Sequence, residues 1–405
     1  MNASLLTTLA DLHAARERVG PVIHLTPVQP SDSLSRLAGR SVVLKSEYEQ
    51  RTGSFKIRGA YNRIAQLPPG CDVVAASAGN HAQGVALAAT LTGRRSTIFM
   101  PQGAAIPKTD ATRNYGAEVR LEGEAVDDAM VAAKEFAREK GAVWVPPFDD
   151  PDIIAGQGTL GLEVLDQVPD AGVVVVPVGG GGLIGGVAAA IKLTRPDVRV
   201  VGVEAAGAPT LTRALEAGHP VRLEQLSTMA DGIALRSVSE RTLAHANAFV
   251  DDVVLVDEEE MTRAILLLTE RAKAVVEPAG AASLAAVLSG RVGGSGTAVP
   301  VLSGGNVDPL LLTKLIEHGL SVAGRYLVLR IVIADHPGAL AALTALLARM
   351  GLNVLDVEHH RSGRSLGLAE VEVMVTVETR NFDHHREVLA ALAGAGYRAS
   401  PVAES

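Results

Sequence analysis

The chain has 405 residues, of which 47% are hydrophobic and 20% charged, an ordinary composition for a soluble globular protein of two or three domains. A formal net charge of −8 and an isoelectric point near 5.8 disfavour nucleic acid and membrane surfaces as partners and favour small-molecule chemistry. Cys71 is the only cysteine, which excludes an intrachain disulfide and suits a reducing, cytoplasmic location.

Residues 1–45 predict a helix, a loop punctuated by prolines and a short strand at 41–45, without the pattern of a signal peptide. The stretch that follows, Arg51 to Ala60, places Lys56 between a turn of small residues and an apolar helix start. Desolvation there would favour the neutral amine, which attacks carbonyl groups and forms Schiff bases. A solvated surface lysine is the alternative interpretation.

Strands and helices then alternate, which predicts two mostly parallel sheets covered by helices. In the first series, strands are expected at 72–76, 96–100 and 118–121, and helices from 79, near 108 and over 125–140. In the second, strands are expected at 173–178, 198–204, 253–256 and 297–302, and helices after 182 and over 261–276. The apolar run at 173–191 approaches the length of a membrane span, but Pro177 and the glycines after it favour a buried strand, a loop and a helix.

Two segments follow a strand and open a helix, so that backbone amides and the helix dipole can bind an anion. Gly179–Gly182 suits a phosphate group, and Ser77–Gly84 suits a carboxylate. For the first segment, a close-packed turn without ligand is one alternative. Another is a dinucleotide site, because Gly180-x-Gly182-x-x-Gly185 is followed by Glu204 at the end of the next strand, which would indicate a nicotinamide-dependent dehydrogenase.

After a linker expected at 321–325, the pattern changes to a ferredoxin-like βαββαβ unit over residues 326–402. Strands are expected at 326–334, 353–358 and 368–378, and helices at 337–350 and 382–393.

Four motifs carry a family resemblance, in this order along the chain: Ser54–Ala60 (Ser-Phe-Lys-Ile-Arg-Gly-Ala), Ser77–Gly84, Gly179–Leu183 and Ser303–Asn306. Together they resemble the threonine/serine dehydratases, which are fold-type II (tryptophan-synthase β-like) enzymes that use pyridoxal phosphate. The resemblance implies a catalytic domain over 1–320, with a small α/β subdomain at about 46–148 inserted in a large one. The C-terminal unit resembles an ACT domain, an amino-acid-sensing module, through Asp335–Gly338 and Gly351–Val354.

The resemblance also implies site residues. The expected catalytic residues are Lys56, Ser77, Ala78, Gly79 and His81, with Lys56 as the base for the Cα proton. The expected cofactor-binding residues are Phe55, Lys56, Asn80, Gly179, Gly180, Gly181, Gly182, Leu183, Glu277, Ser303 and Gly304. Effector-binding residues are expected at Asp335, His336, Gly338 and Asn353. A neutral hydroxyl, Ser303, at the pyridine nitrogen would weaken the electron sink and favour prompt loss of a β-substituent.

The activity that the resemblance implies is dehydration and deamination of L-threonine to 2-oxobutanoate and ammonia, with L-serine to pyruvate as a side reaction. Isoleucine or valine is the expected effector, and a homodimer or homotetramer the expected assembly. A serine racemase is less favoured, because those enzymes place a serine where this chain has Ala78. A catalytically inactive amino-acid sensor is a further alternative.

No metal site is expected. The divalent-cation site of some relatives would need an acid about six residues after Glu204, where this chain has Thr210. The pairs His359-His360 and His384-His385 lack carboxylate or thiolate partners at diagnostic spacing.

Overall fold

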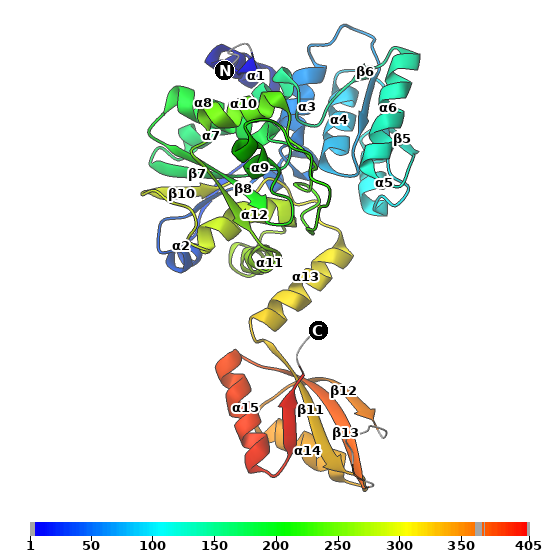
Figure 1. Ribbon diagram of the computed structural model, residues 1–405, viewed down its shortest axis with the longest axis vertical. Helices are drawn as coiled ribbons and strands as arrows, with labels where there is room; N and C mark the ends of the chain where they lie inside the picture. Colours follow the sequence, from blue (N-terminus) through cyan, green and yellow to red (C-terminus); the bar gives the residue numbers. More distant parts are fainter. Residues whose placement is uncertain (1–4, 361–366, 368, 403–405) are drawn as a thin grey trace. The chain divides into compact units, whose positions relative to one another are not determined.

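The computed structural model describes residues 5–360, 367 and 369–402. It divides into two compact units, residues 1–312 and 313–405, and each is described by itself. Both α/β sheets lie in the first unit and an antiparallel sheet in the second (Figure 1).

The first sheet of the first unit is parallel, with strand order β5-β4-β3-β6. Its strands are β3 (Val73–Ala76), β4 (Ser96–Met100), β5 (Glu118–Leu121) and β6 (Val143–Trp144). Its helices are α3 (Lys56–Ile64), α4 (Asn80–Leu91), α5 (Ile106–Asn114) and α6 (Val126–Lys140). Because side chains alternate along a strand, Val73 and Ala75 pack with α3 and α4, whereas Val74 and Ala76 pack with α6 on the opposite face.

The second sheet is also parallel, with strand order β10-β7-β8-β9. Its strands are β7 (Ala171–Pro177), β8 (Arg199–Ala205), β9 (Asp252–Val256) and β10 (Thr297–Pro300). One face is covered by α8 (Gly182–Thr194), with α7 (Pro151–Gln167) behind it. The other is covered by α12 (Pro278–Leu288), with α11 (Glu258–Leu267) nearby (Figure 1).

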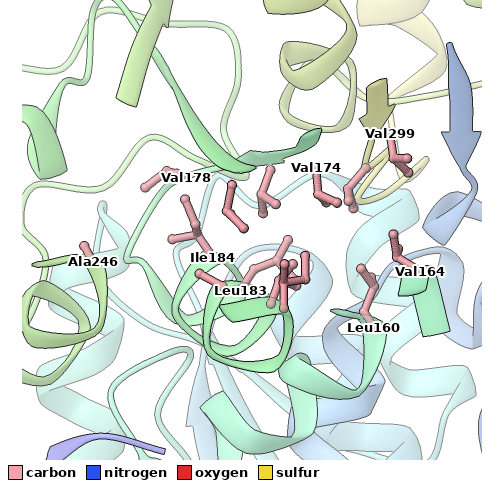
Figure 2. Close-up of a cluster of buried hydrophobic side chains, with 14 of the residues drawn as sticks. Leu160, Val164, Val174, Val178, Leu183, Ile184, Ala246 and Val299 are labelled. Atoms are coloured by element: carbon pink, nitrogen blue, oxygen red, sulfur yellow. The ribbon is translucent and has the colours of Figure 1, made fainter. Parts of the chain in front are cut away.

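The largest apolar core of this unit lies between β7 and α8, and Figure 2 shows Leu183 and Ile184 among its buried side chains. The run at 173–191 is therefore a buried strand, a loop and a helix, as predicted. Among the described residues, no helix combines the length and the apolarity that a membrane crossing requires.

The remaining elements of the first unit connect or flank these sheets. They are α1 (Leu9–Val19), β1 (Val28–Pro30), α2 (Asp32–Ala38), β2 (Val43–Lys45), the 3-10 turns η2 (Glu47–Glu49) and η3 (Arg51–Gly53), α9 (Thr210–Ala217), α10 (Glu240–Phe249) and the π turn η4 (Leu268–Ala272). The segment containing β2 bridges to the β10 segment, at Val42 with Ala298 and at Lys45 with Val301. Residues that precede the first sheet in the chain thus extend the second.

The second unit contains an antiparallel sheet of order β12-β13-β11-β14. Its elements are β11 (Tyr326–Ala334), α14 (Ala339–Arg349), β12 (Val354–His360), β13 (Glu370–Glu378), α15 (Phe382–Gly394) and β14 (Arg398–Pro401). Alternate residues of β11, such as Leu329 and Ile331, pack with Leu343 of α14 and Val388 of α15. The predicted βαββαβ order is confirmed, although Leu368, the predicted start of the third strand, lies outside the described residues.

Two predicted boundaries are wrong. The helix expected over 261–276 begins at Glu258, because Asp257 and Glu260 form a capping box, and it closes in the π turn, after which Lys273 adopts a left-handed conformation with φ 58°. The linker expected at 321–325 is helical in its first two residues, since α13 (Pro309–Val322) continues through Gly319. Helix capping and the continuing apolar pattern decided these ends.

Helix α7 is not predicted from the sequence pattern, because it contains Gly156, Gly158 and Gly161, which disfavour isolated helices. In the fold these glycines let neighbouring backbones approach. A Cβ on Gly156 would lie 2.7 Å from the Arg58 carbonyl oxygen, and a Cβ on Gly161 would lie 2.8 Å from that of Val187. Close packing of α7 against α3 and α8 therefore stabilises a helix of low intrinsic propensity.

A buried charged cluster joins α7 to α3 and to the β2 segment. The Arg58 guanidinium donates to both carboxylate oxygens of Glu47, at 2.7 and 2.8 Å, and to Glu163, at 2.6 Å. The Lys45 ammonium donates to Glu163 at 2.8 Å and to Gln167 at 2.8 Å. Two cations and two anions balance one another in a volume without solvent, so each charge depends on its partners.

Replacing Glu163 by alanine removes a carboxylate to which the buried cations Arg58 and Lys45 both donate hydrogen bonds. We expect the Glu163→Ala variant to lose about 3–5 kcal/mol of unfolding free energy. Urea unfolding followed through Trp144, the only tryptophan, measures this loss. Asp166→Ala on the same helix removes an exposed partner of Arg16 and should cost less than about 1 kcal/mol. Equal losses in the two variants would contradict the role given to the buried cluster.

Candidate active site

Lys56 is the first residue of α3 and follows the two turns η2 and η3. Its ammonium nitrogen lies 3.2 Å from the carbonyl oxygen of Pro147 and 5.2 Å from the centre of the Phe55 ring. Burial lowers the pKa of Lys56 from 10.5 to about 8, and the negative charge of Glu277 opposes this shift. A substantial fraction of the amine is therefore neutral near physiological pH, as nucleophilic and base chemistry require.

The glycine loop lies next to the segment that Lys56 contacts. Gly181 adopts φ 86° and Gly182 begins α8, whose first helical bond runs from the Gly185 amide to the Gly181 carbonyl at 2.9 Å. The amides of the first turn thus lack helical acceptors and can bind an anion. A Cβ on Gly180 would lie 2.3 Å from the ring of Phe148, the residue after Pro147, so this approach requires glycine.

A second helix start belongs to α4, which packs against the Lys56 backbone: a Cβ on Gly84 would lie 3.1 Å from the Lys56 carbonyl carbon. Helix α4 begins at Asn80, its N-cap is Gly79, and the Gly79 amide donates to the Ser77 hydroxyl at 3.1 Å. Ala78, between them, has no ionisable group. The site therefore includes two helix N-termini, and both are favourable to anions.

A chain of amides and a carboxylate holds Asn80. Its side-chain nitrogen donates to Glu277 at 2.6 Å, and its oxygen accepts from Asn306 at 2.7 Å. Asn306 also donates to the carbonyl of Thr52 at 2.7 Å, which supports Thr52 in a left-handed conformation with φ 64°. One N–H of Asn80 remains available for a ligand oxygen.

Gly304 lies where three of these groups meet. A Cβ there would be 2.3 Å from the Glu277 carboxylate, 3.1 Å from Cβ of Ser54 and 3.2 Å from the Asn80 nitrogen. Its neighbour Ser303 is buried, and the Ser303 carbonyl accepts the Phe55 amide at 3.1 Å. The loop after β10 is thus attached directly to the segment that carries Lys56.

The site leaves two hydroxyls without protein partners. Thr52 Oγ1 and Ser54 Oγ are buried and have no hydrogen-bond partner among the described residues. Buried polar groups are almost always paired, so these two hydroxyls lack a hydrogen-bond partner that a polar ligand could supply. With a reactive amine, an anion-binding loop and these hydroxyls, the residues present fit pyridoxal phosphate, a phosphorylated aldehyde.

The side chains of two predicted site residues have their contacts within the protein. His81 is buried, its Nε2 donates to the carbonyl of Val145 at 3.0 Å, and burial together with Lys56 lowers its pKa to about 3. It is therefore neutral and held by the backbone. The Leu183 side chain lies in the apolar core between β7 and α8, and its backbone amide belongs to the first turn of α8.

Glu204, the acid of the alternative dinucleotide fingerprint, is buried and occupied. It accepts from the Leu211 and Thr212 amides at 2.6 and 2.9 Å and from the hydroxyls of Thr212 and Thr210 at 2.7 and 3.1 Å. These donors come from the first turn of α9, so Glu204 stabilises that helix start and is not free to bind a ribose. Among the described residues, no three His, Cys, Asp or Glu side chains converge on a metal position.

The expected effector residues do not lie together in one copy of the second unit. Asp335, His336 and Gly338 form the turn before α14, whereas Asn353 follows that helix. Eleven helical residues separate them, or roughly 16 Å at 1.5 Å per residue. Asn353 instead lines a hollow of about 580 Å³ with Arg325, Thr379 and His384.

Several residues of the site are not predicted from the sequence. Asn306 belongs to a recognised motif but was not assigned to the site, and Thr52 precedes the reactive lysine by only four residues. Phe148, Lys108 and Asp231 carry no sequence signal, because only the fold brings them to the site.

Two parallel sheets, a buried lysine with a lowered pKa and a glycine loop that opens a helix are the features expected of a fold-type II pyridoxal-phosphate enzyme. The family model for "Pyridoxal-phosphate dependent enzyme" matches residues 19–304, and the ACT domain model matches residues 327–394.

The L-threonine ammonia-lyase of Geobacter sulfurreducens is 46% identical over 390 residues, which cover 95% of this chain and 97% of that protein. That of Thermotoga maritima is 45% identical, covering 97% and 98%. The crystal structure of a T.th. threonine deaminase is 43% identical with a TM-score of 0.72, covering 74% of this chain and 99% of that one. A maize serine racemase structure is 34% identical with a TM-score of 0.73, covering 78% and 98%. The chain belongs to the threonine ammonia-lyase family of pyridoxal-phosphate dependent enzymes, with an ACT domain at its C-terminal end.

The lowered pKa of Lys56 predicts how the cofactor-free protein takes up pyridoxal phosphate. Only the neutral amine attacks the aldehyde, so covalent attachment to Lys56 should slow about tenfold per pH unit below 8 and level off above it. Glu277 raises the pKa of Lys56, so Glu277→Gln should move the midpoint to lower pH. Attachment is measured by absorbance and by mass after reduction.

Glu259 is exposed, so the Glu259→Gln variant is the matched control. It should leave the midpoint pH of cofactor attachment unchanged. A wild-type midpoint near 10.5, or an upward shift in Glu277→Gln, would contradict the electrostatic account of this site.

Proposed function

We propose that the protein is a threonine ammonia-lyase, which converts L-threonine to 2-oxobutanoate and ammonia and acts on L-serine, more slowly, to give pyruvate. The near full-length similarity to relatives named L-threonine ammonia-lyase, through both the catalytic part and the ACT domain, carries this proposal. In the net reaction, the Cα proton and the β-hydroxyl leave as water, and one water replaces the nitrogen to give ammonia.

Pyridoxal phosphate supplies an aldehyde for the substrate amine and a ring that withdraws electrons from Cα. The α8 N-terminus with Gly179–Gly182 would bind the phosphate, and Asn80 would offer its remaining N–H to the 3'-oxygen. Ser303 would present a neutral hydroxyl to the ring nitrogen. The loop is closely packed, since a Cβ on Gly180 would lie 2.3 Å from the Phe148 ring and a Cβ on Gly181 2.8 Å from Cβ of Thr242.

Lys56 performs the proton chemistry. With a pKa of about 8 it is neutral often enough to accept the Cα proton, and it can return to the charged form beside Glu277. The N-terminus of α4, from Ser77 to Asn80, orients the α-carboxylate so that the Cα–H bond faces this amine. Ala78 supplies no acid to the opposite face of Cα, which favours elimination over racemisation.

The ACT domain binds an amino acid as an effector in this proposal, with isoleucine or valine as its ligand. The protein is a homodimer or homotetramer in the cytoplasm, a compartment that suits the unpaired Cys71.

Catalysis is tested with purified holoenzyme and L-threonine. We expect 2-oxobutanoate to accumulate and a yellow absorbance band to change on substrate addition. Lys56→Ala should lower the rate by about 10²–10⁴-fold or more, because the base and the covalent anchor are lost together. Lys140→Ala, at an exposed lysine of α6, should be unaffected. D-serine from L-serine, or no 2-oxobutanoate from L-threonine, would contradict the assignment.

Regulation is tested by adding isoleucine or valine to the full chain. Coupling between two sites is typically worth about 1–3 kcal/mol, so the half-saturating L-threonine concentration should shift by about 5–150-fold. L-alanine serves as the control amino acid. An unchanged threonine saturation curve at high isoleucine and valine would refute this part of the proposal.

A further inference from the structure

Lys108 is a mostly buried cation that the expected site does not include. It lies on α5, its side chain is 14% exposed, and its ammonium nitrogen lies 2.5 Å from a carboxylate oxygen of Asp231. Asp231 belongs to the segment between α9 and α10, and its side chain is 60% exposed. The pair therefore connects α5, beside the first sheet, to a loop between β8 and β9 of the second sheet.

The ammonium of Lys108 lies inside the site and not at its rim. A Cβ on Gly79, the N-cap of α4, would be 3.8 Å from the Lys108 nitrogen. Gly232, next to Asp231, would place a Cβ 3.7 Å from the Glu277 carboxylate. The pKa of Glu277 is raised to about 7, first by burial and then by the negative charge of Asp231, while Lys108 opposes the rise, so Glu277, Asp231 and Lys108 lie close enough to interact.

A cation beside a helix N-terminus is electrostatically unfavourable unless an anion joins it, because the helix end is itself positive. Asp231 supplies that anion from an exposed position, where an ion pair is weak and readily exchanged. An amino-acid substrate brings a carboxylate with the same charge to the same helix end. The Lys108 ammonium and the α4 N-terminus together therefore favour one bound carboxylate. Either Asp231 or the substrate can supply it.

We propose that Lys108 binds the α-carboxylate of the substrate together with the N-terminus of α4, and that Asp231 occupies Lys108 until the substrate arrives. The inference rests on the proposed function, since it assumes an amino-acid substrate. Substrate binding then exchanges one carboxylate for another and frees Asp231. Ligands without a negative carboxylate gain nothing from Lys108.

The loop that carries Asp231 has a second attachment, which provides a matched control. Arg222 donates to Asp127 of α6 at 2.6 Å, an exposed ion pair. Asp127→Asn weakens the attachment of the loop without altering a charge beside Gly79. Lys108→Met removes the cation, and Lys108→Arg restores it.

The experiment compares L-threonine with threoninamide, which lacks the negative carboxylate, in the holoenzyme and its variants. In Lys108→Met we expect KM for L-threonine to rise by about tenfold or more, as for loss of a charge-assisted hydrogen bond, with kcat changed far less. The inhibition constant of threoninamide should stay within about twofold. Lys108→Arg should recover most of the loss, and Asp127→Asn should leave both constants unchanged.

Equal weakening of L-threonine and threoninamide in Lys108→Met would overturn the inference, as would an unchanged KM. Asp231→Asn provides an independent arm, because it frees Lys108 and should lower KM for L-threonine; a higher KM would contradict the exchange. Wild-type production of 2-oxobutanoate tests the proposed function separately. If it fails, spectral titration of the holoenzyme and Lys108→Met with 2-hydroxybutyrate and its amide still decides whether Lys108 binds a carboxylate.

Discussion

The position of the reactive lysine depends on the buried ion cluster around Arg58. Lys56 opens α3, and two residues later Arg58 fixes that helix to Glu47, just before the reactive loop, and to Glu163 on α7. Because Arg58 and Glu47 are fully buried, their charges have no water to replace a lost partner. The cluster therefore ties three separate segments of chain together next to the first turn of α3, which Lys56 opens.

The site uses the same few physical means repeatedly. Helices α4 and α8 both begin there with glycine at the N-cap, which leaves their first amides accessible to anions. Burial lowers the pKa of Lys56 and raises that of Glu277, so both groups titrate near neutrality. Lys108 and Asp231 add a second pair of opposite charges to the same space. The two groups that titrate near neutrality, Lys56 and Glu277, are thus surrounded by charges of opposite sign that compensate one another.

The second unit raises a separate question, which is where on it an amino-acid effector could bind. Its sheet is covered by α14 and α15, and its expected effector residues lie at the two ends of α14. An effector as small as an amino acid cannot contact both ends within a single copy. Asp335 and Asn353 are thus alternative positions within one copy, or they meet only when copies associate.

The sequence by itself determined the order of the sheets' strands along the chain, and the resemblance of its four motifs indicated the family and the cofactor class and predicted Lys56 as the reactive amine. These depend on local patterns: alternating or continuous apolar runs in strands, and glycines that must follow a strand where a helix opens. The ferredoxin-like unit was predictable for the same reason, since Leu329 and Ile331 repeat with the period of a strand.

Only the tertiary structure decided those features that depend on contacts between residues far apart in the chain. Helix α7, with its three glycines, exists because α3 and α8 pack against it, and no local propensity indicates this. Glu204 could have bound a ribose by its spacing, yet the start of α9 occupies both of its oxygens. His81 lies in a recognised motif but turns to the backbone of Val145, and Lys108 reaches Asp231 across 123 residues of sequence. Spacing in the sequence shows which residues could approach one another, but only the packing of the fold determines which charged and polar groups become partners.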